Sequence, residues 1–95
     1  MESEPTRNDV VTVGTTSVAL TGLETRKRKV IYLRNTGVVA VTINFGASPA
    51  VLGSGIVLNA NEYIMDSNNE NYECYQGIVT AISSGAGTTV AIFER

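Results

Sequence analysis

The residues best suited to chemistry form the stretch 66–70 (DSNNE), which places oxygen ligands at alternate positions, as the start of a calcium-binding loop does. Two later positions depart from that pattern. Asn71 stands where such a loop needs a glycine, and Gly77 stands where it needs the closing glutamate. We therefore expect an exposed polar loop here, with no metal and no cofactor.

Nucleophilic and acid–base catalysis find little support in the composition. The 95 residues include no histidine, which removes the commonest general base and the commonest transition-metal ligand. The single thiol, Cys74, has no histidine to activate it and no second cysteine to pair with. It is expected to behave as a small buried hydrophobic residue. We predict that the chain is not an enzyme and has no catalytic residue.

The strongest charge feature is the basic run Arg26-Lys27-Arg28-Lys29. One interpretation is an electrostatic contact with phosphates or with an acidic protein surface. The other is a solvated loop that also protects a strand edge, since Lys and Arg discourage edge-to-edge pairing. The run has no interleaved aromatic residue and the net charge is −2, which argues against nucleic acid as the partner.

The N-terminal residues 1–9 are polar and predict a flexible arm ahead of one domain at residues 10–95. Within the arm, the residues expected to meet a partner are Glu4, Pro5 and Arg7. The start of the chain lacks the pattern of a secretory signal, and no apolar run approaches the ~20 residues that span a bilayer. We expect synthesis in the cytoplasm and no membrane contact.

Alternating apolar and polar residues predict the elements that must position these groups. Residues 28–46 alternate on both sides of Asn35-Thr36-Gly37, which predicts an antiparallel hairpin with its turn there. Tyr32 falls on the polar face, where its ring serves either an interface or cross-strand packing. A final hairpin at residues 78–93 is expected to bury Val90 and Ile92.

Turn signals recur along the whole chain at roughly 8–12 residues, and no long helical period is present. This spacing predicts an all-β fold, a compact, jelly-roll-like antiparallel β-sandwich of roughly seven or eight short strands. A small barrel is the second choice.

Five motifs suggest a relationship to a known group of proteins. They are Arg28-Lys29-x-Ile31-x-Leu33-x-Asn35-x-Gly37, Val41-x-Ile43-x-Phe45-Gly46, Gly55-Ile56-x-Leu58, Tyr75-x-Gly77-x-Val79-x-Ala81-Ile82-Ser83 and Thr89-x-Ala91-x-Phe93-Glu94. Their order over residues 10–94 resembles that of small β-sandwich virion proteins of tailed phages. Many of those are capsid decoration, or cement, proteins.

The resemblance implies a structural protein of the virion that sits on the capsid surface and bridges major capsid subunits. It also implies a homo-oligomer, with a trimer favoured, and no small-molecule substrate. The arm and the basic run are then the expected contacts with the major capsid protein. Two alternatives stay open. One is a tail, neck or head-fibre component, possibly a glycan- or host-binding module. The other is a small host-directed or nucleic-acid-binding protein that uses residues 26–29.

Overall fold

The computed structural model describes residues 7–21, 28–46 and 48–95, which form eight strands and no helix. The strands are β1 (Arg7–Val13), β2 (Val18–Thr21), β3 (Val30–Asn35), β4 (Val41–Phe45), β5 (Ile56–Leu58), β6 (Tyr63–Ser67), β7 (Val79–Ser83) and β8 (Thr88–Glu94). The β-branched residues Val, Ile and Thr are frequent in these strands and suit a pleated surface.

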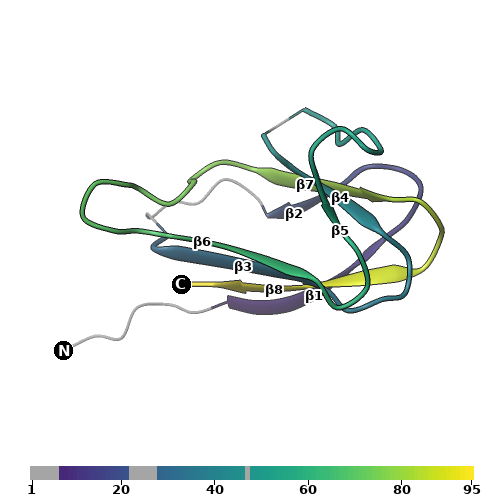
Figure 1. The fold of residues 1–95 in the computed structure, drawn as a ribbon, viewed down its shortest axis with the longest axis horizontal. Helices are drawn as coiled ribbons and strands as arrows, with labels where there is room; N and C mark the ends of the chain where they lie inside the picture. The colour runs from purple at the N-terminus through teal and green to yellow at the C-terminus, as the bar shows by residue number, and fades with distance from the viewer. Residues whose placement is uncertain (1–6, 22–27, 47) are drawn as a thin grey trace.

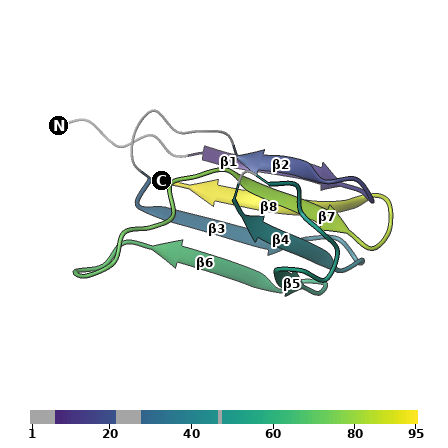
Figure 2. The same cartoon turned by 90° about the horizontal axis from the view of Figure 1, so that it is seen from above.

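The strands form two antiparallel sheets of four, with the orders β1-β8-β3-β6 and β2-β7-β4-β5. The first strand pairs with the last, the second with the second-last, and so on inward along the chain. These hydrogen-bonded pairs are β1 with β8, β2 with β7, β3 with β6 and β4 with β5. This arrangement is the strand order of an eight-stranded jelly roll. Figures 1 and 2 show the two sheets as stacked layers. The predicted β-sandwich is confirmed, and the sheets do not close into a barrel.

The two predicted hairpins are wrong, although their strands are present. β3 and β4 belong to different sheets, and residues 36–40 cross from one sheet to the other. β7 and β8 are likewise in different sheets. Period-2 alternation reports which face of a strand is buried and carries no information about its hydrogen-bonding neighbour. The expected burial of Val90 and Ile92 is confirmed, with exposures of 0% and 2%.

The core lies between the two sheets, which face each other with alternating side chains. Its residues are Val13, Leu20, Ile31, Leu33, Val41, Ile43, Leu58, Cys74, Val79, Ala81, Val90 and Ile92. The loop after β4 covers part of the other face of the second sheet. There Thr42 accepts a hydrogen bond from Gly53 N at 3.0 Å, and the hydroxyl of Thr80 donates to Ser48 O at 3.0 Å.

The predicted arm extends too far along the chain. β1 begins at Arg7, so residues 7–9 are strand, held by antiparallel pairing with β8. Glu4 and Pro5 lie outside the described residues, as do Arg26 and Lys27 of the basic run.

Candidate functional site

One buried carboxylate joins the arm and the basic run, the two segments that the sequence predicts to contact a partner. Glu94 is 4% exposed and lies near the end of β8. Its Oε1 atom accepts a hydrogen bond from Nη1 of Arg7 at 2.7 Å, and its Oε2 atom lies 3.0 Å from Nε of Arg28. Arg7 opens β1, and Arg28 comes two positions before β3. The carboxylate therefore ties together two points that are far apart in the sequence.

Arg28 is a correction to the expected solvated loop, since it is only 3% exposed. Its Nη1 atom donates to the carbonyl oxygens of Tyr75 and Gly77, at 2.8 and 3.2 Å. The backbone N–H of Arg28 donates to the side chain of Gln76 at 2.8 Å, and that side chain donates back to Arg28 O at 2.7 Å. The planar guanidinium can be buried because carbonyls and a carboxylate surround it. Arg28 therefore anchors the segment 74–77 and presents no basic surface.

Arg7 is half-buried and binds partners on both sides. Besides Glu94, its guanidinium donates to the carbonyl oxygen of Leu20 and lies 3.0 Å from the carboxylate of Asp9. Burial acts to lower the pKa of Arg7, but the hydrogen bonds to Glu94 and Asp9 outweigh it and raise that pKa. The pKa of Asp9 is lowered, first by the hydrogen bond from Val10 N and then by Arg7. Arg7 is therefore ordered within the sheet.

The same end of the sandwich carries the remaining described residue of the basic run. Lys29 is exposed, and its backbone N–H donates to Arg95 O at 2.6 Å. Figure 2 places the chain's C-terminus beside the starts of β1 and β3. The structure thus brings Arg7, Arg28, Lys29 and Arg95 to one end, with the first two sharing Glu94.

Tyr32 lies on the outer face of the first sheet, as alternation predicts. Its ring stacks on that of Tyr63, with centroids 5.2 Å apart, and Tyr63 is 61% exposed. On its other side Tyr32 is opposite Phe93 of β8. A shallow depression beside it is lined by Asn8, Asp9, Val10, Tyr32, Ala91, Ile92 and Phe93. The ring therefore packs across strands and also forms part of an exposed aromatic surface.

The oxygen-rich stretch from Asp66 serves the local structure. The Asp66 carboxylate accepts hydrogen bonds from Tyr72 Oη and from Tyr75 N, both at 2.9 Å. Asn68 accepts the backbone N–H of Cys74 at 2.6 Å. Among the residues the structure describes, no three His, Cys, Asp or Glu side chains gather as a metal site would need. These polar groups instead hold the long connection between β6 and β7.

Cys74 is buried, as its sequence context predicts, with 1% exposure. Burial raises the pKa of its thiol, and the neighbouring Asp66 carboxylate adds to that effect. The reactive form of a cysteine is the thiolate, so a buried thiol with a raised pKa is a poor nucleophile. Cys74 thus has the environment of a packing residue.

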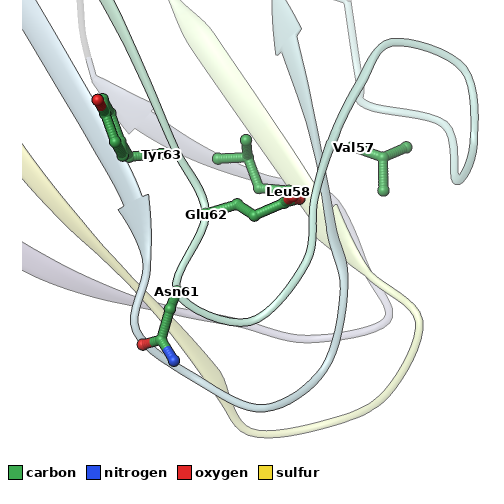
Figure 3. A pocket seen from close by; sticks show the side chains of 5 residues that line it. All are labelled: Val57, Leu58, Asn61, Glu62 and Tyr63. Atoms are coloured by element: carbon green, nitrogen blue, oxygen red, sulfur yellow. The ribbon is translucent and has the colours of Figure 1, made fainter.

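A second depression lies beside the turn that joins β5 to β6, and Figure 3 shows its lining residues Val57, Leu58, Asn61, Glu62 and Tyr63. Asn61 adopts φ 67°, the left-handed conformation that asparagine tolerates in tight turns. Glu62 accepts the backbone N–H of Asn59 at 2.7 Å. The polar groups in this depression therefore stabilise the turn, and they do not converge on a common point.

Glu94 is the residue that sequence reasoning missed. The signal was present, because Thr88, Val90, Ile92 and Glu94 are every second residue of one strand. A carboxylate on the face of Val90 and Ile92 must be buried, and a buried carboxylate needs a cationic partner.

Comparison with family models, with curated proteins and with solved structures finds no match. Within the described ranges 7–21, 28–46 and 48–95, no helix long and apolar enough to cross a bilayer occurs.

Proposed function

We propose that this chain is a structural protein of a phage virion that binds the outside of the capsid and stabilises it by bridging major capsid subunits. One observation carries the proposal. Arg7 of the predicted arm and Arg28 of the basic run are both fixed to the same carboxylate of Glu94. This anchoring brings the starts of β1 and β3 to one end of the sandwich, where the exposed Lys29 and Arg95 can contact a partner.

The architecture supports this proposal without deciding it. Jelly rolls occur in viral capsid proteins, and also in lectins and cupins, so the fold alone does not assign a role. The ion pairs of Glu94 with Arg7 and Arg28 link three segments at this end of the sandwich, and a surface that is already held in place has a lower ordering cost on docking. Many copies on a symmetric shell need only a modest affinity each, because binding to the assembled state raises its stability.

The experiment mixes the purified protein with expanded capsids of its own virus and follows cosedimentation and the capsid melting temperature. Saturable binding with a raised melting temperature is the expected result. Charge reversal by Arg95→Glu at the proposed contact end should weaken binding. Arg34→Glu, on the outer face of the first sheet, is the matched control and should leave binding unchanged. Absence of binding, or equal loss in both variants, would contradict the proposal.

A tail, neck or head-fibre component is the second candidate, and the stacked pair Tyr32 and Tyr63 favours it. Exposed aromatic rings are common in binding surfaces because they offer apolar area with a polar tip. The number of copies per purified particle separates the two candidates. Hundreds of copies indicate the capsid surface, whereas a number near the symmetry of the tail indicates the second candidate.

A further inference from the structure

Four strands form the edges of the two sheets, and three of them carry features that discourage pairing with another chain. β1 carries the charged residues Arg7 and Asp9. β2 has four residues, and its register with β7 shifts between Ala19 and Thr21. β5 has only three residues. Short length, charge and irregular register are devices by which natural sheets prevent edge-to-edge association.

β6 lacks these devices. Its five residues contain no lysine, arginine or proline, and they pair with β3 in an unbroken register. Its one charged residue, Asp66, lies on the inner side opposite Ile31, where Tyr72 Oη and Tyr75 N donate to its carboxylate. That charge is engaged within the subunit and does not guard the edge.

The backbone of β6 presents hydrogen-bonding groups at this edge. Asn35 N donates to Glu62 O at 3.0 Å, so the carbonyl of Glu62 faces β3. In an antiparallel strand, the backbone N–H and C=O groups of successive residues point alternately to one neighbouring strand and to the other side. Ile64 and Asp66 therefore also direct these groups to β3. The intervening residues direct theirs away from the sheet, and these are Tyr63, Met65 and Ser67.

The side chains around this edge are apolar and exposed. Tyr63 and Met65 are 61% and 57% exposed, and the Tyr63 ring is held in place by stacking on Tyr32. Figure 2 shows β5 along the same side of the sandwich as β6. On β5, Ile56 and Val57 are 37% and 44% exposed. A partner at this edge would thus meet both backbone hydrogen-bonding groups and apolar surface.

We propose that β6 is a self-association edge, at which two copies of this chain pair antiparallel about a twofold axis at Met65. In this register Met65 lies opposite Met65 of the second copy, and Tyr63 lies opposite Ser67. Each outward N–H then meets an outward carbonyl, because the three outward-facing residues are paired only with one another. Asp66 lies opposite Ile64, so no like charges face each other across the axis.

A second copy fits this edge because the five-residue strand is complementary to itself, as an isologous interface requires. Pairing of the strands alone buries less than the roughly 1,200 Å² of a stable interface, so the apolar side chains on β5 must contribute. The association is therefore reversible and depends on concentration. It gives a dimer, where the family resemblance implies a trimer, and it does not depend on the proposed capsid role.

The first test measures the mass of the purified protein by sedimentation over a wide concentration range, without capsids. A shift from monomer to dimer mass is expected. Met65→Lys places a charge on the axis and should return the dimer to monomer mass. Val10→Lys is the matched control, because Val10 is 60% exposed on the edge strand β1, and it should leave the dimer intact. Unchanged urea unfolding of both variants shows that each subunit remains folded.

The second test fixes the register through oxidation of introduced cysteines. Met65→Cys should form a disulfide-linked dimer, since paired residues have Cα atoms ~5.5 Å apart, within the range of a disulfide. Tyr63→Cys should not, because the two copies of position 63 are then four residues apart along the strand, or ~13 Å. A monomer or trimer at all concentrations, a dimer that Met65→Lys does not dissociate, or equal crosslinking at both positions would overturn the proposal.

Discussion

The side-chain amide of Asn35 donates a hydrogen bond to the carbonyl oxygen of Leu58 at 2.9 Å and so joins the two sheets through a buried contact. Asn35 ends β3 in the first sheet, and Leu58 ends β5 in the second. Asn35 has 0% exposure, and its amide also donates to Val39 O at 2.8 Å. Its Oδ1 atom accepts from Gly37 N at 3.0 Å and from the hydroxyl of Thr88 at 3.2 Å.

Asn35→Asp should therefore destabilise the fold by about 2 kcal/mol or more. The carboxylate has the same shape but cannot donate, so the carbonyls of Val39 and Leu58 both lose the hydrogen bond from the amide, and the contact with Leu58 is fully buried. Urea unfolding at neutral pH measures the loss. Asn71→Asp is the control, because Asn71 is exposed, and it should change the free energy of unfolding by less than about 0.5 kcal/mol. Equal effects at the two positions would argue against this account of Asn35.

Glu94→Gln should cost about 3–5 kcal/mol, because it leaves the buried Arg28 guanidinium without its counter-charge. It also removes the ion pair with Arg7. The measurement is the midpoint of urea unfolding compared with that of Glu70→Gln, a change of the same chemistry at an exposed position. A Glu94→Gln protein as stable as the control would show that the ion pairs contribute nothing net.

Gly37→Ala tests the crossing between the sheets. A Cβ atom on Gly37 would overlap the side chain and the backbone of Thr88, so this substitution forces a backbone shift that costs about 1–3 kcal/mol. Gly14→Ala is the matched control, because a Cβ there meets nothing within 4 Å. Gly14→Ala should be neutral or slightly stabilising, since it restricts the unfolded chain. Thermal unfolding of both variants decides the comparison, and equal melting temperatures would contradict the predicted overlap.

The Asp9 carboxylate should contribute stability on the alkaline side of its titration. Its pKa is lowered below the ordinary value of 3.8 by the hydrogen bond from Val10 N and by Arg7. A lowered folded-state pKa means stability that is present above pH 3.8 and is lost as the pH falls through the folded value. Carboxyl NMR titration should give Asp9 a midpoint below that ordinary value. An Asp9 midpoint at or above the ordinary value would contradict this.

The Cys74 thiol should react with a disulfide reagent only when the protein opens. Burial raises the pKa of this thiol and closes it to solvent, so both thiolate fraction and access are low. The reaction rate in native buffer should be far below that in urea, and Cys74 is the only cysteine, so the readout is unambiguous. Equal rates in the two conditions would place the thiol at the surface.

The sequence by itself determined the strands and their buried faces. The alternation of Ile31 with Leu33, and of Val90 with Ile92, reports local burial, which depends on the side chains of the strand alone. Only the tertiary structure decided the partners, because pairing depends on residues far along the chain. The turn signal at Gly37 predicted that β3 pairs with β4, whereas β3 pairs with β6 and β8 in the structure.

The candidate site divides in the same way. The basic run and Tyr32 were visible as residue types, and alternation placed Tyr32 on the outer face. The sequence could not tell that Arg28 is buried while Lys29 is exposed, because the difference depends on Glu94, 66 positions from Arg28 along the chain. A charged side chain is stable in the interior only where folding brings a counter-charge to it, and that juxtaposition exists only in three dimensions.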